Sequence, residues 1–182
     1  MPDMNRFTLL CGAIPTLTWL DGCSAGEQAI EELTDVGMST GVAAFNVIPD
    51  RNYTPGSPNL KLINLQEVLA MTERRGLPLI GGTEMNSPGQ KFVDDFDSDA
   101  LYPLRPAFLK GAHILYAHTV LQGMAGMGYL SEWAKNSFAD VFAKNDFFNA
   151  FGEAFASSLH STTGSIELSP GSFPIWCPDI SH

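Results

Sequence analysis

Residues 41–48 read Gly41-Val42-Ala43-Ala44-Phe45-Asn46-Val47-Ile48, an almost unbroken apolar run. A strand that is covered on both faces in a parallel sheet has this composition, whereas a strand with one solvated face alternates apolar and polar residues. The run passes directly into Pro49 and Asp50, which are typical of a loop. This stretch therefore predicts a buried parallel strand with a polar loop at its carboxyl end.

Three other stretches repeat the theme of an apolar run that ends in polar residues: 16–21, 77–84 and 112–120. Apolar residues at helical spacing lie between the runs, and the helical patterns end near glycines, where a left-handed cap residue is expected: Gly37, Gly76 and Gly111. Strands that alternate with helices at this spacing predict βα units and a parallel sheet with right-handed crossovers.

Two architectures of the α/β class fit four such units. One is half of a (β/α)₈ barrel, since a full barrel has eight strands and about 250 residues, and the other is an open doubly wound parallel sheet. We expect a single barrel-like domain over residues 1–158 and an irregular tail over 159–182, which is rich in Ser, Thr, Gly and Pro. A half barrel leaves strand edges unpaired, which predicts a homo-oligomer or completion by the remainder of a longer chain.

Composition narrows the classes of partner. The 182 residues are 45% hydrophobic and 16% charged, as in a globular domain. Twenty acidic against ten basic side chains give a net charge of -10, the wrong sign for binding nucleic acid. No apolar run approaches the roughly 20 residues of a membrane helix, and the N-terminus lacks the pattern of a signal peptide, so we expect a cytoplasmic protein with no membrane partner. The three cysteines have no zinc-site spacing and are expected to be reduced thiols.

The candidate site lies where the apolar runs end. Each run has, on its C-terminal side, a residue that can bind a metal or move a proton: Asp21, Asp50, Glu84 and His118. In barrels and open α/β sheets alike, the carboxyl ends of the strands form the rim of the active site. The ordinary alternative is that the carboxylates cap helices and that the histidine is structural.

A carboxylate and an imidazole at adjacent strand ends suit a divalent metal, zinc or manganese. The pattern predicts Glu84, His118 and Asp21 as metal ligands and Asp50 as a further ligand or general base. Asn46 shares the strand face of Asp50, which indicates that this face points into the interior of a barrel.

Two loops offer groups for a small-molecule substrate. Arg51 and Asn52 follow the second run, and a guanidinium suits carboxylate or phosphate recognition. The long loop after the third run contains Asn86 and Lys91. These four residues predict binding of a small anionic substrate, although surface ion pairs and a solvated loop explain them equally well.

Three segments carry a resemblance to known proteins: Phe45–Asn52, Gly82–Asp95 and Gly128–Ala134. Across roughly Leu17 to Phe155 the chain resembles the C-terminal half of longer bacterial proteins related to the polymerase-and-histidinol-phosphatase (PHP) and amidohydrolase-type metal-dependent barrels. The resemblance implies a barrel with metal ligands at its strand ends, of the types of Glu84 and His118. The His-x-His pair that those families carry on the first strand does not occur in this sequence.

Three functions follow as hypotheses. The first is a metal-dependent hydrolase in which a divalent ion activates water. The second is a barrel-type lyase or isomerase with Glu84 or His118 as base, which needs no metal. The third is a non-catalytic half-barrel module that associates with other chains.

Overall fold

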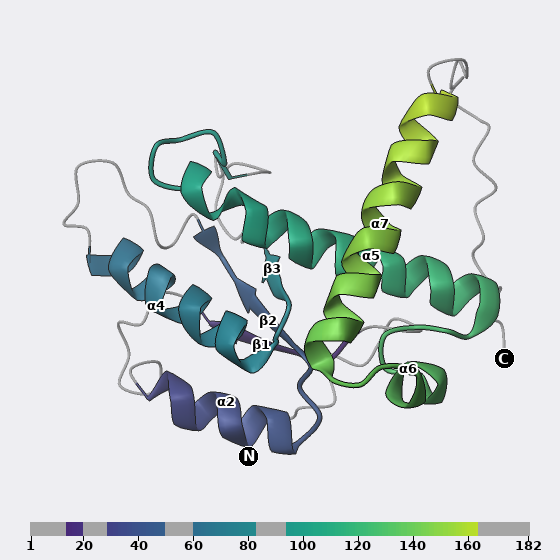
Figure 1. Ribbon diagram of the computed structural model, residues 1–182. Coiled ribbons are helices and arrows are strands. Elements are labelled where there is room, and N and C mark those ends of the chain that lie inside the picture. Colours follow the sequence, from purple (N-terminus) through teal and green to yellow (C-terminus); the bar gives the residue numbers. More distant parts are fainter. Residues whose placement is uncertain (1–13, 20–28, 50–59, 83–93, 164–182) are drawn as a thin grey trace, which may run out of the picture.

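The computed structural model describes residues 14–19, 29–49, 60–82 and 94–163 (Figure 1). These residues form a mixed α/β fold that is mostly helical and contains a small parallel sheet. The elements in chain order are β1 (Thr16–Trp19), α2 (Ile30–Ser39), β2 (Ala44–Val47), α4 (Leu60–Arg75), β3 (Leu79–Gly81), a 3-10 helix η2 (Tyr102–Leu104), α5 (Arg105–Ala125), α6 (Glu132–Ser137) and α7 (Val141–Thr163). The prediction of an α/β chain with a parallel sheet is confirmed at this level.

The sheet has the order β1-β2-β3, and both pairs of strands are parallel. Trp19 is opposite Val47, and Val47 is opposite Gly81, so the three strands end at one common edge. Three of the four predicted runs therefore contain strands, and their order follows the chain. Below, the carboxyl edge means the edge at which these strands end.

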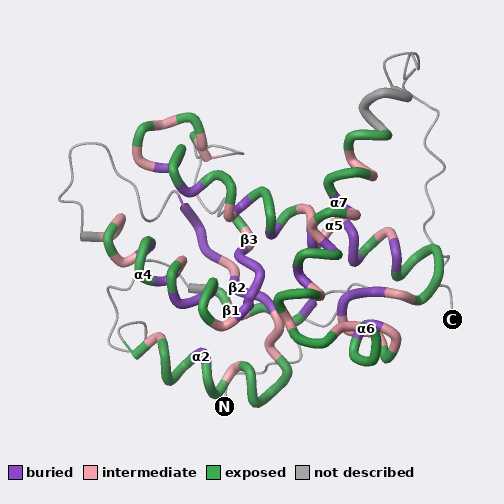
Figure 2. Tube along the Cα trace, viewed as in Figure 1, coloured by how far each residue is buried: buried purple, intermediate pink, exposed green. Residues whose placement is uncertain are grey.

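The core between the sheet and α4 is formed by the alternate side chains of β2 and β3. Phe45, Val47 and Leu79 pack in one buried cluster with residues of α4, among them Leu65 and Met71. Figure 2 shows that β2 is largely buried, whereas helices α2 and α4 have exposed outer faces. Burial of apolar surface at about 25 cal/mol per Å² makes this cluster a main source of stability.

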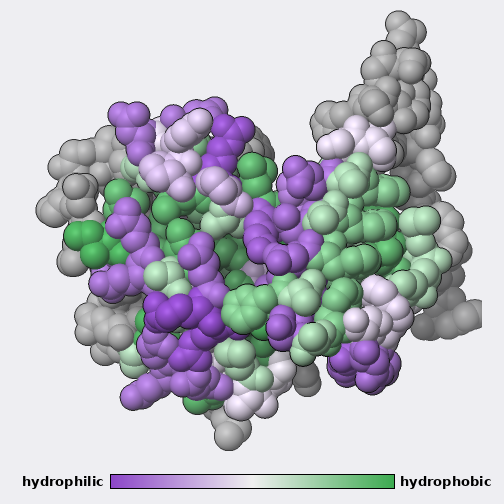
Figure 3. All heavy atoms as spheres, in the orientation of Figure 1, coloured by the Kyte–Doolittle hydropathy of each residue, from purple (hydrophilic) through white to green (hydrophobic). Residues whose placement is uncertain are grey.

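Helix α4 ends where the glycine pattern predicts. Gly76 follows its last residue, Arg75, and has φ of 65°, the left-handed conformation that glycine adopts without strain. At this end Arg75 forms ion pairs with Glu31 and Asp35 of α2, and Arg74 forms another with Glu31. Figure 3 shows the resulting hydrophilic surface over α2 and α4.

The predicted fourth strand, residues 112–120, is wrong, because these residues lie within the 21-residue helix α5. Gly111 does not cap a helix that precedes a strand; it lies inside α5 and is buried. A Cβ at this position would overlap the carbonyl oxygen of Leu79, so the glycine allows α5 to pack directly on the backbone of β3. Apolar residues then continue at helical spacing through Ile114, Ala117 and Leu121.

Helix α5 runs antiparallel to the strands. Near its beginning, Phe108 approaches Gly81 at the carboxyl edge, whereas Ile114 and Ala117 pack with Ile14 and Ala44 near the amino ends. The helix thus lies along β3, an edge strand of the described sheet, and no fourth strand is present in the described ranges. A half barrel is therefore not confirmed.

Helix α7 packs across α5, as Figure 1 shows. At the crossing, Gly152 lies against the backbone of His113. Phe148 is fully buried there and belongs to an aromatic cluster with Tyr129, Trp133 and Phe138. Within the described residues, no helix has the length and apolar character that crossing a membrane requires.

Candidate functional site

A small polar group lies on the sheet at its carboxyl edge. The Asn46 amide on β2 donates a hydrogen bond of 3.2 Å to the Thr18 hydroxyl on β1. On the other side of Asn46, the backbone N–H of Gly82 donates to the Val47 carbonyl at 2.8 Å. A Cβ at position 82 would lie only 2.7 Å from Asn46 Oδ1, so glycine leaves room for this amide. We call Thr18, Asn46 and Gly82 the Asn46 patch.

The Asn46 patch is partly open to solvent. Asn46 and Gly82 are half-buried and Thr18 is exposed, whereas Phe45 and Val47, on the opposite face of β2, are fully buried. Asparagine is depleted in strands because its short polar side chain packs poorly on a pleated surface. A polar residue in the middle of an otherwise apolar strand is therefore a local exception of the kind found at functional sites.

Seven of the predicted site residues lie outside the described residues: Asp21, Asp50, Arg51, Asn52, Glu84, Asn86 and Lys91. The structure does show the strands that precede them in the chain. Asp21 follows β1, Asp50 follows β2, and Glu84 follows β3, each within three residues of the strand's last residue. The parallel register brings these three strand ends to one edge, beside the Asn46 patch.

The prediction that His118 lies at a strand end is wrong. His118 is in α5, and its neighbours in the core include Ala117 and Leu121, which pack with the amino ends of the strands. Because α5 runs antiparallel to the strands, His118 lies toward the amino ends of the strands, away from the carboxyl edge. The prediction that His118 and Glu84 follow adjacent strands is therefore wrong for His118, and Glu84 lies outside the described residues.

His118 instead supports the packing of the segment after α5. Its side chain is 3% exposed, and its Nδ1 accepts a hydrogen bond of 2.9 Å from the Tyr129 backbone N–H. A neutral ring that accepts at Nδ1 carries its proton on Nε2. Nε2 is buried and has no hydrogen-bond partner among the described residues. Burial lowers the pKa of His118 and so keeps the imidazole neutral.

A series of buried hydrogen bonds continues from Tyr129, and the sequence did not predict it. The Tyr129 hydroxyl donates to Asn145 Oδ1, and Asn145 Nδ2 donates to the Gly76 carbonyl at 2.9 Å. Burial raises the pKa of Tyr129, so the phenol stays protonated and able to donate. Lys144 lies over the Tyr129 ring, with Nζ at 3.9 Å from the ring centroid. These hydrogen bonds connect α7 to the turn between α4 and β3.

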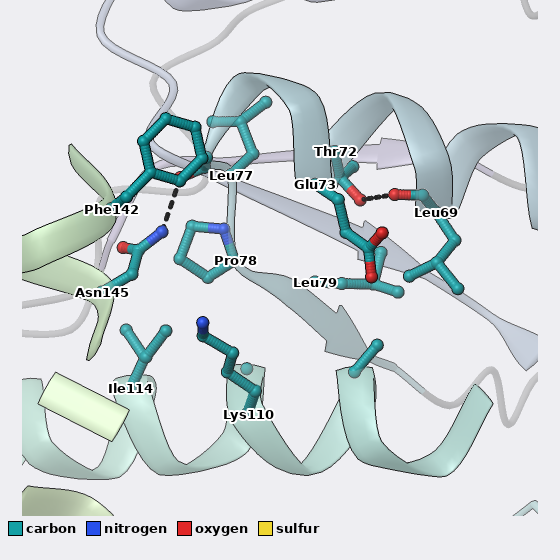
Figure 4. A pocket seen from close by; sticks show the side chains of 13 residues that line it. Leu69, Thr72, Glu73, Leu77, Pro78, Leu79, Lys110, Ile114, Phe142 and Asn145 are labelled. Carbon is teal, nitrogen blue, oxygen red and sulfur yellow. Dashed lines mark hydrogen bonds between the residues drawn. The ribbon is translucent and has the colours of Figure 1, made fainter. Parts of the chain in front are cut away.

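A cavity of about 240 Å³ opens beside this turn (Figure 4). Its walls come from α4, the α4–β3 turn, α5 and the start of α7. The lining is mainly apolar, and its polar side chains are Thr72, Glu73, Lys110 and Asn145. Because Gly76 and Leu77 lie at the amino end of β3, this cavity is separate from the Asn46 patch. No motif in the sequence indicates it, since the lining residues come from distant segments.

Comparisons of the chain with family models, with curated proteins and with solved structures found no match. The resemblance to the PHP and amidohydrolase-type barrels thus stays a prediction. In the part of the chain that the structure describes, His, Cys, Asp and Glu side chains form no group of three that could hold a metal ion. Among the described residues, the cavity beside Gly76 is one place for a ligand, and the carboxyl edge, which precedes the predicted loop residues, is another.

Proposed function

We propose that the chain is a metal-dependent hydrolase that acts on a small anionic substrate at the carboxyl edge of the sheet. The observation that carries the proposal is the parallel register of β1, β2 and β3, which brings together the three strand ends that precede Asp21, Asp50 and Glu84. Parallel α/β sheets bind their ligands at this edge. The polar Asn46 patch at the same edge adds support.

Because His118 lies in α5 and not at a strand end, we leave it out of the proposed metal site, and this choice changes the metal that we propose. Without the imidazole, the predicted ligands are the carboxylates of Asp21, Asp50 and Glu84. Oxygen ligands of this kind suit manganese or magnesium, whereas zinc favours sites with imidazole or thiolate. Of the two metals predicted from the sequence, we therefore propose manganese.

The chemistry divides among the residues of the edge. A bound divalent ion lowers the pKa of a coordinated water. Asp50, as one of the ligands, would help Asp21 and Glu84 to hold this ion, and the proton of the activated water would pass to solvent. Arg51 and Lys91, with the amides of Asn52 and Asn86, bind the anionic group of the substrate. The net charge of -10 makes such local cations important, because the chain as a whole repels anions.

Manganese binding tests the proposal without knowledge of the substrate. Protein purified without chelators is titrated with Mn²⁺, and the free ion is followed by electron paramagnetic resonance. We expect one site per chain, lost in Glu84→Gln and Asp50→Asn because each removes a negative ligand. His118→Asn is the matched control and is expected to bind Mn²⁺ as the wild type does. Absence of binding, or binding that both carboxylate variants retain, would rule out this site.

A further inference from the structure

The cavity between α4, α5 and α7 has the features of a second binding site, separate from the carboxyl edge. Its volume of about 240 Å³ is below the roughly 300–1,000 Å³ of pockets that hold drug-sized ligands. The cavity therefore suits a ligand smaller than a drug-sized molecule.

The walls indicate an apolar body for this ligand. Leu69 of α4, Leu77 and Leu79 near β3, and Ile114 of α5 line the cavity. Figure 4 shows these side chains around the opening, with Pro78 between Leu77 and Lys110. Water in contact with such walls forms few hydrogen bonds, so its displacement by an apolar group is favourable.

The polar groups indicate one negative charge. Figure 4 shows the Lys110 side chain rising from α5 toward Pro78, on the same side of the cavity as Asn145. Asn145 is 5% exposed, and its Nδ2 carries two N–H bonds, of which Gly76 accepts one. The second N–H and the Lys110 ammonium can both donate to a carboxylate.

Two acidic side chains limit the charge that the cavity accepts. Lys110 pairs with Asp146 at 2.8 Å, but both side chains are largely exposed, at 47% and 71%, and exposed pairs of this kind are held weakly. Lys110 can therefore exchange this partner for a ligand. Glu73 lies on the α4 wall, beside Leu79 and Thr72 (Figure 4), where it would repel a second negative charge.

From these observations we propose that the cavity binds a small apolar monocarboxylate, with its carboxylate on Lys110 and Asn145 and its hydrocarbon body against Leu69, Leu77 and Ile114. The proposal does not rest on the hydrolase function, because no residue of the carboxyl edge takes part in it.

Isovalerate is a suitable probe, with isoamyl alcohol and isoamylamine as analogues that lack the negative charge. Binding to the full chain is measured by chemical-shift changes in ¹H-¹⁵N spectra. We expect saturable changes at residues around Gly76 and α5 with isovalerate, and binding of the two analogues at least about tenfold weaker. Absence of saturable binding of isovalerate would overturn the proposal, and equal binding of the alcohol would overturn the carboxylate assignment.

Substitutions in α5 test whether isovalerate binds in this cavity. Ala107→Phe places a ring in the cavity that Ala107 lines and should abolish binding. Ala112→Phe, on an exposed position of the same helix outside the lining, is the matched control and should bind isovalerate as the wild type does. Lys110→Met keeps the apolar stem without the charge and should weaken binding at least about tenfold. Binding that survives both Ala107→Phe and Lys110→Met would place the probe elsewhere and overturn the proposal.

Discussion

His118 shows how burial decides the protonation of a single residue. The side chain lies in the core, and the hydrogen bond from the Tyr129 backbone N–H to Nδ1 requires a lone pair on that nitrogen. Protonation of Nδ1 would remove this acceptor and place a positive charge in an apolar cluster. The folded chain therefore favours the neutral ring, and the pKa of His118 is lowered by its burial.

This lowered pKa predicts a dependence of stability on pH. The unfolded chain takes up the His118 proton as the pH falls below the ordinary value of 6.5, whereas the folded chain does so only at lower pH. The stabilisation is thus complete above pH 6.5 and is lost as the pH falls toward the lower pKa of the folded state. We expect the free energy of unfolding to decrease from about pH 7.5 to 5.5, by at most about 1.4 kcal/mol per pH unit from this residue. Urea denaturation at a series of pH values measures it.

His118→Asn is the informative variant for this prediction. An asparagine Oδ1 can accept the Tyr129 N–H in place of Nδ1, and it does not titrate. We expect a smaller pH dependence in His118→Asn than in the wild type. If His118→Asn keeps the full pH dependence, the effect belongs to another group.

At the scale of the element, two glycines show why the sequence predicted one helix end correctly and another wrongly. Gly76 and Gly111 both follow a helical pattern and precede an apolar run, so the sequence predicts a cap and then a strand at each. Gly76 has a positive φ and ends α4, as predicted. Position 111 requires a glycine because α5 packs against the backbone of Leu79 there. This contact joins distant segments, and no local sequence pattern indicates it. The strands β1, β2 and β3 and their common edge were predictable; the helical environment of His118 was not.

The close contact of α5 with β3 predicts opposite effects for two substitutions in one helix. Alanine is normally favoured over glycine inside a helix by about 1 kcal/mol. At Gly111 the added Cβ would overlap the Leu79 carbonyl oxygen, so Gly111→Ala should destabilise the chain by about 3 kcal/mol or more. At Gly123, in the same helix, an added Cβ would meet nothing within 4 Å, so Gly123→Ala should stabilise the chain by about 0.5–1 kcal/mol. Chemical denaturation of both variants measures the difference, and a Gly111→Ala variant as stable as the wild type would contradict the packing of α5 on β3.

At the scale of the whole molecule, α5 joins two cores. Leu104, next to the start of α5, and Phe108 belong to the cluster that includes Phe45 and Leu65. Ile114 and Leu121, further along α5, belong to a second cluster, which includes Phe148 of α7. Loss of either cluster removes a large part of the packing that holds α5 in place. The two cores are therefore expected to unfold together, although they lie on different parts of the sheet.

Substitutions in each core test this coupling. Leu65→Ala removes a fully buried side chain from the first cluster and should cost about 2–5 kcal/mol, and Phe148→Ala in the second should cost about 3–5 kcal/mol. Trp133, whose ring centroid is 6.5 Å from that of Phe148, reports on the second core. In a background with Trp19→Phe and Trp176→Phe, the Trp133 fluorescence and the far-ultraviolet circular dichroism should give one midpoint in each variant, because α5 transmits the loss from one core to the other. A Leu65→Ala variant whose Trp133 transition keeps the wild-type midpoint would show instead that the second core, with α6 and α7, is stable without the first.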